Sequence, residues 1–311
     1  DFWKNKRELV TGAHGFVGNN VMKLLQEKEC NILAPSSQEL DLTNEEQVKS
    51  YFFKNQPQII LHLAGKVGGI AANKAAPGDF FYKNIMMGTL VMEYAYRSGC
   101  EKVVALAAGC GYPKHLSVPY TEEDFWKDLP DENSIGYSMA KKNLIIQSWT
   151  YREQYGFNSV VLLPANLYGP HDNFDLETSH VVPALIRKFL EAKTTDAAQV
   201  EVWGSGTASR EFLYSQDTAQ AILDMAETVD ESGPFNLGTG QETTIKELVE
   251  AIKEITGFKG EVIWDASRPD GQPRRFYDMT KFKNALGYVP ATTLEEGLKH
   301  TIEWYKKEKS L

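Results

Sequence analysis

A tyrosine and a lysine four residues apart, Tyr137 and Lys141, are the residues whose types and spacing most directly suggest chemistry. On a helix this spacing places both side chains on one face, one turn apart. A lysine ammonium beside a phenol favours the phenolate, so we expect Lys141 to lower the pKa of Tyr137 from its ordinary value of about 10. Such a pair can exchange a proton with an oxygen whose carbon gains or loses a hydride. Because Tyr-x-x-x-Lys pairs also decorate ordinary helix surfaces, the chain must also provide a nucleotide site and a carbonyl substrate.

A glycine-rich turn near the start of the chain is the first candidate for the nucleotide site. Gly12, Gly15 and Gly18 follow a short apolar run at 7–11 and precede an apolar-periodic segment. Glycines at these positions permit a tight turn and a close approach of the backbone to a pyrophosphate at the helix N-terminus. The pattern predicts a dinucleotide-binding strand, turn and helix. A glycine turn without a ligand is the alternative.

The segment after the second expected strand, 31–34, bears on the choice of dinucleotide. An acidic residue usually binds the ribose of NAD at this point, but here the chain has Ser36 and Ser37 and no carboxylate. Two hydroxyls that can bind a 2′-phosphate favour NADP(H). NAD(H) stays possible because no arginine is present to bind the phosphate. The alternative is that these serines bind no cofactor and only begin a loop. Asp41 and Leu42 are expected to border the adenine.

Strand and helix patterns alternate regularly through the first half of the chain. Apolar runs at 31–34, 59–63, 103–106 and 159–163 follow the first strand, and the longest helical patterns lie at 80–99 and 137–155. This alternation predicts an α/β protein with a Rossmann-type, doubly wound parallel sheet that binds ligands at its carboxyl end. The regularity stops after Pro170. We therefore expect an NADP(H)-binding domain at 1–170 plus about 205–230, and a smaller α/β substrate domain in the rest of 171–311.

The composition limits the classes of partner. The net charge of −9 argues against nucleic acid and against an anionic membrane surface. No apolar run has the length of a membrane span, and we expect no signal peptide. Three cysteines make no disulfide framework, which predicts a reducing cytoplasm. No metal site is predicted.

Basic residues in the second half stand out against this acidic background. Guanidinium groups suit a diphosphate, so the set favours an anionic ligand of the size of a sugar nucleotide. Taken singly, each is more often a solvated surface charge. The set is Arg187, Lys188, Arg210, Arg268, Arg274 and Arg275.

Several blocks of sequence resemble the GDP-L-fucose synthase family, within the extended short-chain dehydrogenase/reductase superfamily. The resemblance runs nearly from end to end of the chain. It is carried by the blocks at Gly65–Ile70, Cys110–Lys114, Asn166–Phe174, Ser179–Val181, Val202–Thr207, Arg210–Phe212 and Pro269–Pro273. Members of that family are NADPH-dependent 3,5-epimerases and 4-reductases of GDP-4-keto-6-deoxy-mannose. They are usually homodimers joined through two long helices, here 80–99 and 137–155.

The resemblance also implies roles for four residues. Tyr137 would donate a proton in the reduction, and Lys141 would bind the ribose and tune Tyr137. Cys110 and His180 would be the base and the acid of epimerisation. A ketone at C4 acidifies the hydrogens at C3 and C5, a thiolate beside a cation can remove them, and a histidine titrates near neutrality. An inert buried Cys110 and a helix-starting His180 are the alternatives.

The predicted binding residues follow from the strand ends and from the resemblance. The cofactor set is Gly12, His14, Gly15, Phe16, Val17, Ser36, Ser37, Asp41, Leu42, Leu63, Ala64, Lys66, Asn84, Lys141, Pro164, Asn166, Leu167 and His180. The substrate set is Ala108, Cys110, Asn166, Asn173, Val181, Arg187, Lys188, Trp203, Arg210, Asp270 and Arg274.

One position departs from the family pattern. The family has a serine or threonine hydroxyl four residues before the tyrosine that is Tyr112 here, and this chain has Ala108. Loss of one such donor to a reacting carbonyl oxygen commonly costs about 10²–10³ in rate. Either another donor replaces it, or the enzyme is a C4 reductase or dehydrogenase for another nucleotide sugar such as a heptose, or the chain has diverged. A catalytically silent protein that binds nucleotide sugars is the reading outside the enzyme class.

Overall fold

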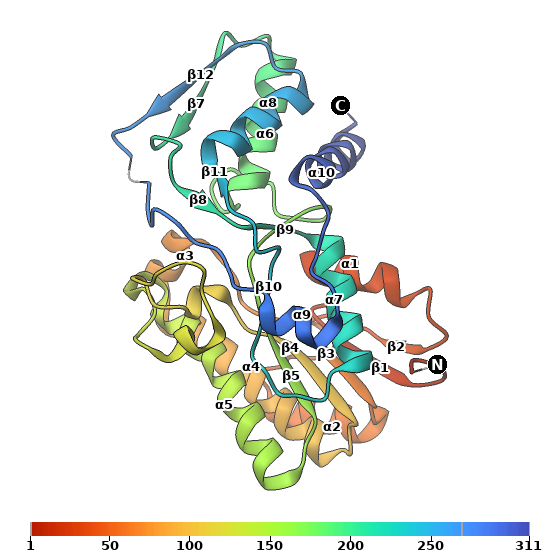
Figure 1. The fold of residues 1–311 in the computed structure, drawn as a ribbon. Helices are drawn as coiled ribbons and strands as arrows, with labels where there is room; N and C mark the ends of the chain where they lie inside the picture. The colour runs from red at the N-terminus through yellow and green to blue at the C-terminus, as the bar shows by residue number, and fades with distance from the viewer. Residues whose placement is uncertain (1, 269, 311) are drawn as a thin grey trace.

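A six-stranded parallel sheet forms the lower half of the molecule in Figure 1, a computed structural model that describes residues 2–268 and 270–310. The strand order is β10-β5-β4-β3-β1-β2, and each neighbouring pair is parallel. The strands are β1 (Arg7–Thr11), β2 (Asn31–Leu33), β3 (Ile59–His62), β4 (Lys102–Leu106), β5 (Ser159–Pro164) and β10 (Phe235–Leu237). The chain reverses its direction of travel across the sheet between β1 and β3, which is where a sheet of this kind binds its ligand. The predicted Rossmann-type fold class is confirmed.

Helices pack on both sides of this sheet. Helix α1 (Phe16–Leu25) packs against α7 (Ser215–Thr228), while α4 (Pro77–Arg97) packs against α5 (Ile135–Tyr155) and α2 (Glu45–Asn55), as Figure 1 shows. Helix α4 begins three residues before the expected 80 because a proline suits the first turn of a helix. Helix α5 begins at Ile135, so Tyr137 lies in its first turn. Among the described residues, no helix combines the length and the apolar character of a membrane span.

A second, smaller hydrophobic core is formed by elements that lie in the upper half of Figure 1. Its buried side chains include Phe189, Ile186 and Ile252, which have no exposed surface. The elements of this region are α6 (Val181–Thr194), β7 (Gln199–Trp203), β8 (Ser209–Arg210), β11 (Thr243–Thr244), α8 (Ile245–Thr256), β12 (Glu261–Asp265) and α10 (Leu294–Lys309). Strand β7 pairs with β12 in parallel, and β8 pairs with β11 antiparallel.

The chain crosses between the two cores more than once. Strand β6 (Asn166–Tyr168) pairs with β9 (Phe212–Tyr214), after which α7 returns to the large sheet and β10 joins its edge. Helix α9 (Thr280–Leu286) packs beside β10. The remaining elements are α3 (Ile70–Ala75) and the 3₁₀ turns η1 (Gly109–Gly111), η2 (Glu122–Trp126) and η3 (Glu132–Ser134). The two domain ranges remain a prediction, and Pro269 of the Pro269–Pro273 block lies outside the described residues.

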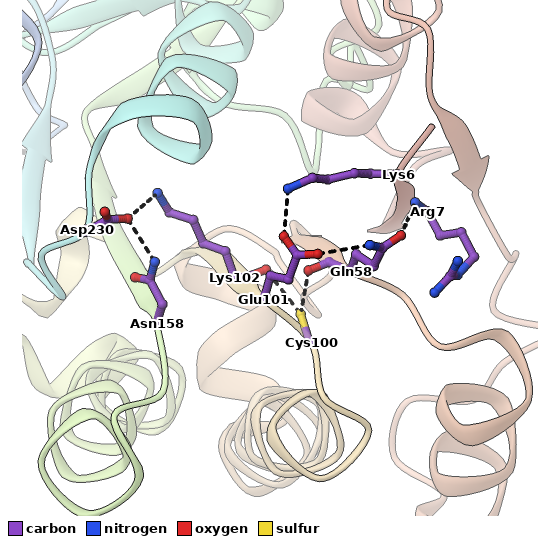
Figure 2. Close-up of polar contacts among 8 residues, drawn as sticks. All are labelled: Lys6, Arg7, Gln58, Cys100, Glu101, Lys102, Asn158 and Asp230. Carbon is purple, nitrogen blue, oxygen red and sulfur yellow. Dashed lines mark hydrogen bonds and ion pairs between the residues drawn. The ribbon is translucent and has the colours of Figure 1, made fainter. Parts of the chain in front are cut away.

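Polar side chains tie together the amino ends of the central strands, opposite the end where ligands are expected. Glu101 accepts hydrogen bonds from Lys6 Nζ at 2.6 Å and from Gln58 Nε2 at 2.9 Å. Figure 2 shows the whole group, which also includes Arg7, Cys100, Lys102, Asn158 and Asp230. These contacts satisfy polar groups at the amino ends of the strands. They do not involve the carboxyl ends of the strands, where ligands are expected.

Glu8, in β1, is a buried carboxylate inside the large core. Its side chain is fully buried, and neither carboxylate oxygen has a hydrogen-bond partner of normal geometry among the described residues. Burial raises the pKa of Glu8 to about 7, against a smaller opposing effect of the nearby Cys30 thiol. Because the folded state holds this proton more tightly than the unfolded chain, stability falls as pH rises from about 4.5 through about 7.

We expect Glu8→Gln to remove this pH dependence. The loss in the parent between pH 5 and pH 8 is on the order of 3 kcal/mol, since each pKa unit corresponds to about 1.4 kcal/mol. Urea unfolding at both pH values measures it, with the exposed Glu303→Gln as the matched control. Parallel pH profiles for parent and Glu8→Gln would show that the buried carboxyl does not titrate in this range.

Candidate active site

The first turns of α5 carry Tyr137 and Lys141. The Lys141 ammonium lies 6.0 Å from the centroid of the Tyr137 ring and donates to the Leu106 carbonyl at 3.3 Å. Burial lowers the pKa of Lys141 to about 8. Burial also raises the pKa of Tyr137, with a smaller contribution from Cys110. The prediction that Lys141 lowers the pKa of Tyr137 was therefore wrong. The desolvation of the phenolate outweighs the neighbouring charge, and Tyr137 keeps the proton that a donor needs.

A cavity of about 390 Å³ opens at the carboxyl ends of β1, β3, β4 and β5. We call it the catalytic cavity, defined by Ala108, Cys110, Tyr137, Asn166 and His180, which all line it. It also takes in eight predicted cofactor residues: Gly12, Gly15, Phe16, Val17, Leu63, Ala64, Pro164 and Leu167. Residues from positions 12 to 180 are thus brought to one place because parallel strands deliver their carboxyl ends to the same edge.

Cys110 and His180 face this cavity in different electrostatic surroundings. The Ser138 hydroxyl donates to Cys110 Sγ at 3.2 Å. Burial raises the pKa of the Cys110 thiol, while that hydrogen bond and the charges of Arg275 and Lys141 act to lower it. His180 is the N-cap residue of α6, and desolvation lowers the pKa of its imidazole, which is therefore neutral at pH 7. A neutral imidazole and a thiol beside cations are groups that can move protons.

The glycine turn between β1 and α1 fits a dinucleotide. Gly12 has φ +70°, and a Cβ built on it would lie 2.8 Å from the Ala64 backbone nitrogen. A Cβ on Gly18 would overlap the Gly12 carbonyl oxygen. Only glycine therefore keeps β1, α1 and the end of β3 this close, which leaves the backbone open to the pyrophosphate of a bound nucleotide at the start of α1.

A second cavity, of about 550 Å³, continues from the glycine turn toward the serines. It shares Gly12, Gly15, Ala64 and Gly65 with the catalytic cavity, so the two cavities adjoin. We call it the serine cavity, and its predicted residues are His14, Ser36, Ser37, Asp41, Leu42 and Lys66. The His14 ring nitrogen Nε2 hydrogen-bonds the Ala34 carbonyl at 3.1 Å. A dinucleotide that lies across both cavities would place its adenosine here.

Asn84 supports the site without lining either cavity. It is buried in α4, where its Oδ1 accepts from the Lys66 backbone nitrogen and its Nδ2 donates to the Lys66 carbonyl, both at 3.0 Å. The Lys66 ammonium pairs with Asp79, also in α4. Asn84 therefore fixes the loop after β3, and Lys83, which sequence reasoning missed, joins Lys66 in the serine cavity.

A third cavity, of about 870 Å³, shares Asn166, Leu167 and His180 with the catalytic cavity. We call it the Trp203 cavity. It is also lined by five further predicted substrate residues: Val181, Lys188, Trp203, Arg210 and Asp270. Trp203 is 63% exposed as a residue, and the Arg268 guanidinium lies over its ring at 4.7 Å from the centroid. A planar group can stack on the other face of the ring. The three shared residues join the Trp203 cavity to the catalytic cavity that holds Tyr137.

The structure does not bring three of the predicted substrate residues to these cavities. Asn173 and Arg187 line a separate cavity with Trp304, where Arg187 pairs with Glu191 at 2.7 Å. Arg274 forms a two-armed salt bridge with Glu242, at 2.7 and 2.6 Å. The guanidinium groups of Arg187 and Arg274 are thus paired with nearby carboxylates. The spacing of residues in the sequence did not reveal these pairs.

The structure adds three residues with polar side chains to the catalytic cavity: Glu211, Arg275 and Tyr277. Arg275 donates to the Gly109 carbonyl, one residue before Cys110. Arg275 carried a signal in the sequence as one of the basic set, whereas an isolated Tyr277 carried none. Among the described residues, no group of three or more histidine, cysteine, aspartate or glutamate side chains is arranged to hold a metal ion.

The fold and the site define a Rossmann-type protein with a dinucleotide site beside a Tyr/Lys pair. Comparison by sequence leads to the same class. Residues 8–238 match the model of the NAD dependent epimerase/dehydratase family. A GDP-L-fucose synthase of Sinorhizobium fredii is 40% identical over 298 residues, which cover 96% of this chain and 95% of that protein. The chain therefore belongs to the GDP-L-fucose synthase family.

Two solved structures have the same overall fold. A GDP-6-OMe-4-keto-L-xylo-heptose reductase from C. jejuni is 30% identical, with a TM-score of 0.91 over 98% of both chains. A GDP-mannoheptose C4 reductase from Campylobacter jejuni with NADP bound is 31% identical, with a TM-score of 0.90 over 97% of this chain and 98% of that one. Proteins named as reductases of two different GDP-heptoses therefore share the fold of this chain.

Proposed function

We propose that this protein is an NADP(H)-dependent epimerase/reductase that converts a GDP-4-keto-6-deoxy sugar of the mannose type to a GDP-L-fucose-type product. One observation carries the proposal. Tyr137, Cys110 and His180 line one cavity that continues into the Trp203 cavity. A proton donor for a ketone and two groups for proton exchange are thus in reach of one bound sugar.

The reaction divides among these residues as follows. Transfer of the thiol proton of Cys110 to the neutral imidazole of His180 gives a thiolate and an imidazolium. The thiolate then takes a proton from the carbon beside the ketone, and the carbonyl stabilises the resulting carbanion as an enolate. The imidazolium returns a proton to the opposite face, so that Cys110 ends again as a thiol and His180 as a neutral imidazole. NADPH held by the glycine turn and the serine cavity would provide the hydride for C4. Tyr137 gives its phenolic proton to the C4 oxygen, and the nearby Lys141 ammonium stabilises the phenolate that remains.

Incubation with NADPH and GDP-4-keto-6-deoxy-mannose tests the proposal. We expect oxidation of the cofactor and a GDP-fucose product whose stereochemistry at C3 and C5 is inverted, as determined by NMR. A folded protein that binds NADPH but leaves every GDP-4-keto sugar unreduced would instead support a silent binding protein.

A C4 reductase or dehydrogenase for another GDP-sugar, such as a heptose, is the second candidate. The methyl group of Ala108 in the catalytic cavity and the likeness to two heptose reductases favour it. Reduction of a GDP-4-keto-heptose without deuterium uptake at C3 or C5 would distinguish this function from the first.

The preference for NADP(H) rests on the serine cavity. Two hydroxyls and the side chains of Lys66 and Lys83 surround it, and these groups suit a 2′-phosphate. Glu39 accepts from the Ser36 backbone nitrogen at 2.7 Å but does not line the cavity. Fluorescence titration with NADPH and NADH tests the preference, and equal affinities would contradict it.

We also propose a cytoplasmic homodimer joined through α4 and α5. Exposed apolar side chains lie on both helices, among them Phe81, Ile146 and Trp149. We expect Ile146→Asp to give monomers in light scattering coupled to gel filtration, because a carboxylate in an apolar contact loses its hydration. Leu129→Asp, at an exposed leucine outside both helices, is the control. A monomeric parent would contradict the proposal.

A further inference from the structure

Reduction of a ketone develops negative charge on the carbonyl oxygen, and a fixed hydrogen-bond donor beside Tyr137 would stabilise that charge. The strand end that lines the catalytic cavity, Ala107 to Gly109, provides no side-chain donor because its side chains are methyl groups or hydrogen. A replacement must come from another part of the cavity wall. Among the described residues that line the catalytic cavity, the hydroxyl groups belong to Tyr137 and Tyr277.

The Tyr277 hydroxyl occupies the space where a side chain on residue 109 would lie. A Cβ built on Gly109 would overlap Tyr277 Oη. The same hydroxyl donates to the Pro164 carbonyl at 3.2 Å, a long bond. Tyr277 thus brings a hydroxyl from a distant segment to the position beside Ala108, and Gly109 leaves the room for it.

Tyr277 is held firmly in this place. Its backbone nitrogen donates to the buried carboxylate of Glu211 at 2.9 Å, and its ring packs 5.4 Å from the Tyr112 ring, centroid to centroid. The other oxygen of Glu211 accepts from Thr239 and Gly240, both at 2.6 Å. A donor fixed before the reaction stabilises developing charge without reorganisation. Burial also raises the pKa of Tyr277, so its phenol keeps a proton to donate.

The neighbouring serine hydroxyl is less suited to this role. Ser138 is fully buried, its hydroxyl donates toward the sulfur and the carbonyl of Cys110, and it does not line the catalytic cavity. Ser138 therefore acts on Cys110 and not on a bound sugar.

We propose that the Tyr277 hydroxyl is the second hydrogen-bond donor to the carbonyl oxygen of the keto sugar, in place of a hydroxyl on residues 107–109. Rotation about the Cζ–Oη bond turns the proton from the Pro164 carbonyl into the cavity while the ring stays fixed. The inference rests on the proposed function, because it assigns a residue to ketone reduction. It makes Tyr277 a catalytic residue that acts together with Tyr137.

Kinetics of Tyr277→Phe test the proposal on the whole protein. We expect kcat for reduction to fall about 10²-fold, with NADPH affinity and KM for the sugar little changed, because the lost bond strengthens in the transition state. Tyr112→Phe is the matched control, since it removes the hydroxyl from the adjacent buried ring, which bonds Asn236 and does not line the cavity. A Tyr277→Phe variant with kcat within about twofold of the parent overturns the inference.

A second variant keeps the test informative even if Tyr277→Phe folds poorly. In the Tyr277→Phe background, the hydroxyl added by Ala108→Ser should raise kcat at least about tenfold. If Ala108→Ser alone raises kcat by about 10²-fold, the donor was missing from the parent and the inference is overturned. A folded parent that reduces no GDP-4-keto sugar overturns the proposed function, and this inference with it.

Discussion

Replacing Tyr137 with phenylalanine is expected to lower kcat for ketone reduction by about 10²–10⁴-fold, the usual contribution of a positioned acid. Tyr137 lines the catalytic cavity, and burial raises its pKa, so its hydroxyl stays protonated until the C4 oxygen takes the proton. The ring is retained in the variant, and its edge-on contact with Phe80, at 6.4 Å between centroids, should survive. We therefore expect the melting temperature to stay close to that of the parent.

Steady-state reduction of the keto sugar at saturating NADPH measures the effect. Tyr51→Phe, on α2 and away from the three cavities, is the matched control. NADPH titration separates a loss of chemistry from a loss of binding. If Tyr137→Phe reduces the sugar at the parent rate, the proton comes from another donor, and the assignment of Tyr137 fails.

Replacing Cys110 with serine is expected to lower the rate of deuterium uptake at C3 and C5 of the sugar by about 10²-fold or more. A serine hydroxyl ionises far less readily than a thiol, so it is a poor base even beside Arg275 and Lys141. Reduction of a sugar that is already epimerised should change little, because Tyr137 remains. The variant thus separates the two halves of the proposed reaction.

Proton NMR in deuterated buffer follows the exchange in samples that contain no NADPH. Oxidation of NADPH in separate samples follows the reduction. Cys30→Ser provides the control, since Cys30 is a half-buried thiol that does not line the catalytic cavity. Deuterium uptake by Cys110→Ser at the parent rate would exclude Cys110 as the base and favour the reductase that does not epimerise.

The two variants also bear on the substrate. Loss of exchange in Cys110→Ser together with loss of reduction in Tyr137→Phe supports the epimerase/reductase. A parent that reduces but never exchanges supports the heptose-type reductase. Because both reactions use one cavity, the same samples distinguish the functions.

Local sequence determined much of the fold and the framework of the site. Alternating strands and helices predict a parallel sheet, and a parallel sheet gathers its carboxyl ends at one edge, so Gly12, Ala108 and Asn166 were expected to meet. The four-residue spacing of Tyr137 and Lys141 predicts one helix face. These inferences succeed because they depend on periods of two and of about 3.6 residues, which the sequence displays directly.

The tertiary structure decided the features that depend on burial and on segments far apart in the chain. Desolvation raises the pKa of Tyr137, although the adjacent Lys141 alone predicts the opposite. Arg187 turns to Glu191 and away from the Trp203 cavity, because its partner lies one turn along the same helix. Tyr277 reaches Gly109 across more than 160 residues of sequence, through a turn held by Glu211. No local period encodes such a contact, so the sequence by itself determines the sheet edge and the Tyr/Lys pair, and the packed structure determines which groups complete the cavity.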